Sequence, residues 1–234
     1  MANTEKLGTK NENNEVKSGK KWIAFFRNNK KLMDGILIGV LAVILLVTAF
    51  YYFRNNQTKK ASNAIISSIE IYNRALSTND TTLFNKALEG DDETDGFLSI
   101  ISDYKITNTS NTAKYYAALC YLHIGNKEET MNYLLDYDKD EDHLFYMAQM
   151  LIGDLYDDQK DVDNAKKYYQ KAIEGEDAIT APIALYKLGM IYERENNWAE
   201  AYNAYQQIQD KYYERYSEMG VDRNLERAKI KAKK

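Results

Sequence analysis

The distribution of apolar positions divides the chain into one continuous apolar segment and a longer region of helical periodicity. Residues 35–53, GILIGVLAVILLVTAFYYF, contain no charged residue. As an α-helix rising about 1.5 Å per residue, this segment would be about 28 Å long, close to the hydrocarbon core of a bilayer. Farther along, apolar residues recur at intervals of three and four, as in Ile65, Ile69, Tyr72 and Leu76. The pattern predicts an all-α chain, with residues 35–53 as a transmembrane helix in contact with membrane lipid.

Charge on the two sides of the apolar segment predicts its orientation. Residues 1–34 hold eight basic and four acidic residues, whereas residues 35–234 hold 23 basic and 31 acidic residues. The basic flank of a transmembrane helix stays in the cytoplasm. We therefore expect a single-pass protein of the bacterial inner membrane, with a cytoplasmic N-terminus and a periplasmic C-terminal domain. A basic tail attached to an acidic domain does not suit a nucleic-acid-binding protein.

A cleavable signal peptide is the alternative interpretation of the same segment. Val47, Thr48 and Ala49 resemble a small-residue cleavage site, and cleavage there would leave a soluble periplasmic binding protein. The four aromatic residues 50–53 that follow are typical of the membrane interface and favour an uncleaved anchor.

The composition along the chain predicts five regions. The first 19 residues, rich in Asn, Lys and Glu, should be a disordered cytoplasmic tail. Residues 20–34 either lie along the inner leaflet as a basic, aromatic segment or serve only as the positive flank. After the membrane helix at 35–53, residues 54–216 should form an extracytoplasmic helical domain. Residues 217–234 read as a charged helix that caps it.

Self-similarity at a fixed interval determines the expected architecture of the domain. In each of three units a small residue is followed by Tyr three positions later, and a second small residue precedes a large apolar one. The units are offset by 35 and then 36 residues. The residues that define the units are Ala118, Tyr121, Thr130 and Leu134; Gly153, Tyr156, Ala165 and Tyr169; Gly189, Tyr192, Ala201 and Tyr205.

These units resemble the tetratricopeptide repeat (TPR). The stretches GDLYDDQKDVDNAKKYYQKA and LGMIYERENNWAEAYNAYQQI match its pattern closely, and AALCYLHIGNKEETMNYL matches it loosely. Small residues would let two antiparallel helices approach, while Tyr and Leu fill the space between neighbouring units. The resemblance implies a TPR α-solenoid. Residues 61–104 are less regular and leave open a degenerate first repeat, followed by an extra helix near residues 97–104.

Candidate chemistry is sparse. Cys120 is the only cysteine. We expect it to lie on a repeat helix with its side chain buried in the core. The two histidines, His123 and His143, lack partners at metal-ligand spacing. The acidic runs at residues 91–96 and 136–141 do not complete an EF-hand loop, because Ser102 and Met147 occupy the places of the final Glu. The sequence therefore predicts no catalytic, cofactor-binding or metal site, and a protein that is not an enzyme.

The concave surface formed by the first helix of each repeat is the expected partner-binding groove. The inward-facing positions give a groove that is apolar and Met-rich at one edge and mainly acidic at the other, which would suit an extended or unfolded polypeptide. The alternative is that these side chains only pack against neighbouring helices. The predicted groove residues are Tyr115, Leu119, Leu122, His123, Met147, Met150, Asp154, Asp157, Asp158, Ile183, Tyr186, Met190, Glu193 and Arg194.

The combination of a basic tail, one membrane helix and a repeat array resembles the YfgM-like ancillary subunits of the bacterial Sec translocon. Stretches such as GFLSIISDY and YYAALCYLHIGN are similar to those of the Bacteroidetes members of that family. The resemblance implies that the protein has two partners, the SecYEG channel and a membrane-anchored periplasmic chaperone, and assists polypeptides that emerge into the periplasm. A scaffold for another envelope assembly or secretion machine is the alternative function.

Overall fold

A computed structural model describes residues 28–139 and 143–233 of the chain. The predictions for the tail at 1–19 and for residues 20–27 of the basic segment lie outside the described residues. The chain divides into two compact units. The first ends at Asn56, and the second begins at Gln57.

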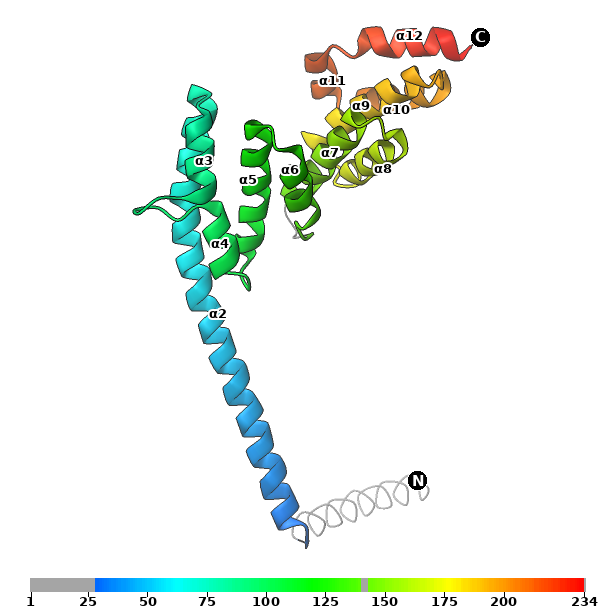
Figure 1. Cartoon of the computed structure of the whole chain (residues 1–234). Helices are drawn as coiled ribbons and strands as arrows, with labels where there is room; N and C mark the ends of the chain where they lie inside the picture. The colour runs from blue at the N-terminus through cyan, green and yellow to red at the C-terminus, as the bar shows by residue number, and fades with distance from the viewer. Residues whose placement is uncertain (1–27, 140–142, 234) are drawn as a thin grey trace, which may run out of the picture. The chain divides into compact units, whose positions relative to one another are not determined.

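Helix α2, Lys30–Thr78, contains the whole apolar segment (Figure 1). Every residue of the apolar segment 35–53 is exposed. Within the described residues, α2 is the one helix that is long and apolar enough to cross a membrane. Its most apolar stretch of 18 residues has a mean hydropathy of 2.6. The hydroxyl of Thr48 donates a 3.0 Å hydrogen bond to the carbonyl oxygen of Ile44, so this hydroxyl is satisfied within the helix. The helix does not break at residues 47–49, the position of the alternative cleavage site.

The second unit is built from the last turns of α2 and ten further helices within the described residues. Helices α5 and α6, α7 and α8, and α9 and α10 pack as successive pairs (Figure 1). No strand occurs in the described part of the chain beyond an isolated bridge between Gly90 and Asp95. The helices are α3 Thr81–Glu89, α4 Phe97–Asp103, α5 Asn108–Ile124, α6 Lys127–Leu135, α7 His143–Asp158, α8 Val162–Ile173, α9 Thr180–Arg194, α10 Trp198–Lys211, α11 Tyr213–Met219 and α12 Asp222–Ala232.

Each helix pair is closed by a small residue on its first helix and a large one on its second. A Cβ atom added to Gly153 would lie 2.7 Å from the ring of Tyr169, and one added to Gly189 would lie 2.5 Å from the ring of Tyr205. In the first pair, Ala118 and Leu134 are buried in one core cluster. The pairs thus combine Gly with Tyr or Ala with Leu, which keeps the summed volume of the contact similar.

The turn inside each pair also repeats. The residue before the second helix's N-cap is left-handed in all three pairs, with φ of 88° at Gly125, 64° at Lys160 and 59° at Asn196. The N-cap side chain that follows then accepts a hydrogen bond from the backbone N–H three positions on. These N-caps are Asn126, Asp161 and Asn197, with donors Glu129, Asn164 and Glu200.

Replacing Asp161 with alanine should destabilise the second helix pair by about 1 kcal/mol, because the N–H of Asn164 loses its acceptor at the start of α8. Asp161→Asn is the matched control, since Asn performs the same role at positions 126 and 197. Thermal unfolding followed by circular dichroism measures the difference. Equal melting temperatures for the two variants would contradict this role of the side chain.

The region before the first pair forms a core of its own. Ile71, Tyr72 and Ala75 of α2, Phe84 of α3 and Phe97 of α4 pack in one cluster. This cluster also contains Cys120 of α5, which is fully buried as predicted, and burial raises the pKa of its thiol to about 12. Helix α4 occupies the place where an extra helix was expected.

The C-terminal region differs from the single charged helix predicted at 217–234. Helix α11 ends at Met219, and Gly220 has a φ of 63°, so the chain turns before α12 begins at Asp222. Val221, Leu225 and Ala228 are buried in the cluster that contains Tyr205 and the rest of the last pair's core. Helix α12 therefore completes the core of the last pair as well as covering it.

A candidate partner-binding groove

The predicted groove residues lie on α5, α7 and α9, the first helix of each pair. Tyr115, Leu119, Leu122 and His123 come from α5. Met147, Met150 and the three aspartates, Asp154, Asp157 and Asp158, come from α7. Ile183, Tyr186, Met190, Glu193 and Arg194 come from α9.

The apolar members differ in how far they reach solvent. Tyr115 is only 3% exposed, and its hydroxyl lies 4.0 Å from the sulfur of Met147. It belongs to the core between α5 and α7, so it is unavailable to a partner, contrary to the prediction. Met190, at 43% exposed, is the most accessible apolar side chain of the set. Leu119, Leu122, Met147, Met150, Ile183 and Tyr186 are half-buried.

His123 does not join the other groove residues. Its imidazole lies flat against the ring of Phe84 on α3, with ring centroids 4.4 Å apart and an interplanar angle of 3°. It also makes an edge contact with Tyr72 of α2. The histidine therefore packs onto the helices that precede the first pair.

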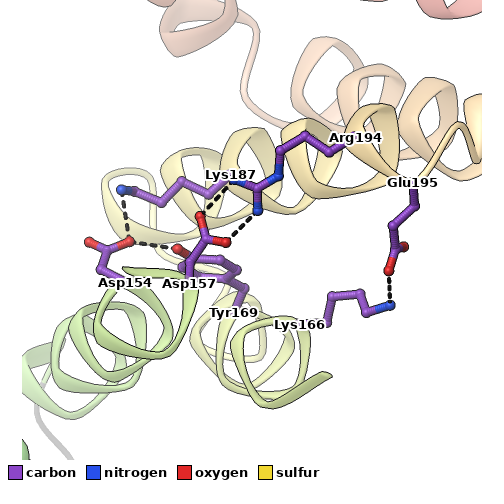
Figure 2. A network of polar contacts seen from close by, with 7 residues as sticks. All are labelled: Asp154, Asp157, Lys166, Tyr169, Lys187, Arg194 and Glu195. Carbon is purple, nitrogen blue, oxygen red and sulfur yellow. Dashed lines mark hydrogen bonds and ion pairs between the residues drawn. The ribbon is translucent and has the colours of Figure 1, made fainter. Parts of the chain in front are cut away.

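The structure gathers the charged members other than Glu193 around a hollow of about 320 Å³ between α7 and α9. Figure 2 shows the carboxylates of α7 facing the cations of α9, with Tyr169 of α8 beside them. The hollow is lined by Asp154, Asp157, Asp158, Tyr169, Lys187, Met190 and Arg194.

Every aspartate in this hollow has a basic partner from another helix. Asp154 lies 2.8 Å from the ammonium of Lys187 and accepts a 2.7 Å hydrogen bond from the hydroxyl of Tyr169 (Figure 2). Asp157 accepts hydrogen bonds from both terminal nitrogens of Arg194. The contacts with Lys187 and Arg194 tie consecutive helix pairs together.

Two further pairs extend this pattern. Asp158 accepts a 2.7 Å hydrogen bond from Lys127 at the start of α6, and Glu193 pairs with Arg227 of α12 at 2.7 Å. The edge predicted to be acidic is therefore electrically balanced. The basic partners Lys127, Lys187 and Arg227 were missed because each lies 31 to 34 residues from its acid. Opposite charges at about the repeat interval were the available signal.

The pKa directions agree with these contacts. The hydrogen bond from Lys127 lowers the pKa of Asp158, and the hydrogen bonds to Asp157 raise the pKa of Arg194. Burial, and then the bond to Asp154, raise the pKa of Tyr169. On α8, Lys166 has a raised pKa because it donates to Glu195, 2.8 Å away at the end of α9 (Figure 2).

Comparison with known families agrees with this geometry. Models of the tetratricopeptide repeat match residues 148–174 and 183–212, which cover most of the α7–α8 and α9–α10 pairs. The chain contains tetratricopeptide repeats. No curated protein matches it. The α5–α6 pair has the same turn and cap as the two matched TPRs, although neither model extends to it.

TPRs imply a role in protein–protein interaction. Among the residues that the structure describes, no group of three or more His, Cys, Asp or Glu side chains is placed to hold a metal ion. The candidate groove combines half-buried apolar side chains with paired charges.

Proposed function

We propose that the protein is a non-enzymatic, membrane-anchored interaction protein of the bacterial inner membrane. The observation that carries the proposal is that one chain combines TPRs with an apolar helical segment whose residues are all exposed. In water, a continuous apolar surface of this length is unfavourable, whereas a bilayer would cover it. The excess of basic residues before the segment supports a cytoplasmic N-terminus and a periplasmic TPR domain.

Within that class, we assign the protein to the ancillary subunits of the Sec translocon. Its partners would be SecYEG and a membrane-anchored chaperone, and it would assist polypeptides that emerge into the periplasm. The resemblance of roughly residues 20–215 to this group supports the assignment. The groove supports it too, because Met147, Met150 and Met190 give an adaptable apolar surface for segments of varied sequence.

A photocrosslinking amino acid at Met190 of the full-length protein in living cells tests the assignment. We expect it to capture newly exported polypeptides or a translocon-associated chaperone, because Met190 is the most exposed apolar residue of the groove. The matched control is the same crosslinker at Lys167, an exposed position on α8. Lys167 should capture several-fold less.

The identity of the captured proteins decides between the alternatives. Equal capture at both positions would show that the groove is not the binding surface. Capture limited to components of outer-membrane assembly or of a secretion machine would support the alternative function, a scaffold for such a machine. Protease added to spheroplasts tests the topology separately. It should digest the TPR domain, and protection of that domain would reverse the proposed orientation.

A further inference from the structure

In each of the first two repeats, a stacked pair of tyrosines joins the two helices of that repeat. Tyr121 of α5 stacks on Tyr133 of α6, with centroids 5.5 Å apart and an interplanar angle of 16°. Tyr156 of α7 stacks on Tyr168 of α8 at 5.4 Å and 21°. The two stacks occupy the same positions of their repeats, because both residues are offset by 35 positions.

The third repeat keeps the first ring of this pair and lacks the second. Tyr192 of α9 corresponds to Tyr156, but Ala204 of α10 stands where Tyr168 would be. Within the described residues, no aromatic ring is paired with Tyr192, and the ammonium of Lys166 on α8 lies 6.0 Å from the centre of its ring. Next to it is a hollow of about 250 Å³, lined by Gln170, Ile173, Leu185, Leu188, Tyr192, Glu200, Asn203, Ala204 and Gln207.

The lining of this hollow corresponds to the surroundings of Tyr168 in the second repeat. Tyr168 packs against the core cluster that contains Ile152, and Leu188 is the residue equivalent to Ile152. Ala204 is only 3% exposed and Leu188 only 6%, so the floor is apolar and formed by residues already fixed in the core. The hollow therefore lies where the repeat geometry places an aromatic ring.

The rim of the hollow also differs from its counterpart in a way that suits a polypeptide. In the second repeat, the ammonium groups of Lys171 and Lys167 lie 4.5 and 5.9 Å from the centre of the Tyr168 ring. The equivalent residues in the third repeat are Gln207 and Asn203, and Gln170 lies on the same rim. These exposed amides carry both donors and acceptors, which match the N–H and C=O groups of a peptide backbone.

We propose that this hollow is a binding site for one aromatic side chain, Tyr or Phe, of a partner polypeptide. The ring would stack on Tyr192 as Tyr168 stacks on Tyr156, a geometry that aromatic pairs prefer. The volume is below the range of about 300–1,000 Å³ typical of pockets for whole small molecules, so it suits a single side chain. None of the lining residues belongs to the predicted groove, so the site stands independently of the function proposed above.

Methyl NMR of the full-length protein in detergent micelles tests this site, with N-acetyl-L-tyrosinamide as the probe. A ring stacked on Tyr192 shifts the methyl signals of Leu188 and Ile173 upfield, and the shift should saturate as the probe is added. N-acetyl-L-leucinamide is the control probe, and it should cause no such shift. An equal response to both probes, or no saturable response to the tyrosine probe, would overturn the proposal.

Two variants test whether the response depends on the space left by the missing tyrosine ring at position 204. Ala204→Tyr should fill the hollow with the protein's own side chain and abolish the response, while its melting temperature stays at or above that of the wild type. Tyr168→Ala should open an equivalent hollow, so that the methyl groups of Ile152 begin to respond to the probe. A response that persists in a folded Ala204→Tyr protein would show that the probe binds elsewhere, which contradicts the proposal.

Discussion

Replacing Gly189 with alanine should lower the free energy of unfolding of the TPR domain by about 1 to 3 kcal/mol, the usual cost of overpacking. The added Cβ would come within 2.5 Å of the ring of Tyr205, which is fully buried. In a short array, each repeat is stabilised mainly by its neighbours, so the loss should spread beyond α9 and α10. Thermal unfolding of the full-length protein in detergent, followed by circular dichroism, measures the effect.

A second substitution distinguishes this steric mechanism from a general loss of stability. In Gly189→Ala combined with Tyr205→Leu, the third repeat acquires the Ala and Leu combination that positions 118 and 134 already have. The double variant should be more stable than the sum of the two single effects predicts, with a coupling of about 1 kcal/mol or more. Additive effects would show that the two residues do not oppose each other across the helix pair.

Two arginines in the apolar segment should remove the protein from the membrane. At the centre of a membrane helix each Arg costs about 3 kcal/mol, whereas each Leu or Ile that it replaces was favourable by about 0.5 kcal/mol. Leu41 and Ile44 are each 51% exposed, so in Leu41→Arg with Ile44→Arg both charges would face the lipid. Membrane fractionation followed by carbonate extraction should move the variant from the membrane pellet to the supernatant.

The control for this variant uses the same helix outside the apolar segment. Asn63 and Ile66 have the same spacing as Leu41 and Ile44 and are exposed on α2. Asn63→Arg with Ile66→Arg adds the same charge and should leave the protein in the pellet. If the variant at 41 and 44 also stays in the pellet, residues 35–53 do not anchor the protein.

The features that were predictable from the sequence are those set by contacts within one repeat. A small residue and a large one sixteen positions apart, such as Gly153 and Tyr169, meet because two helices joined by a short turn bring them together. An N-cap residue before the second helix, such as Asp161, was a further signal of the turn that was not used. Burial of Cys120 followed from its place on the inner face of a repeat helix.

Contacts between repeats were much harder to predict. The balance of the charged edge depends on Lys187 and Arg194 reaching back to α7, and a side chain's direction across an interface is not visible in its own helix's periodicity. Tyr115 was assigned to the groove from its repeat position, but the neighbouring helix α7 covers it. The break at Gly220 was missed because few apolar residues mark α12, although Leu225 and Ala228 are buried.

The ion pairs between repeats also bear on how the array comes apart. Asp154 with Lys187 and Asp157 with Arg194 connect the second repeat to the third, and Glu193 with Arg227 connects the third repeat to α12. Such nearest-neighbour coupling makes the array behave as a one-dimensional chain of linked units. Helix α12 packs on the last pair and is linked to it by the pair of Glu193 with Arg227, so we expect this contact to open before those between the central repeats. Because these pairs are partly exposed, added salt screens them. Higher ionic strength should therefore broaden the melting transition, as the terminal helix frays before the central repeats unfold.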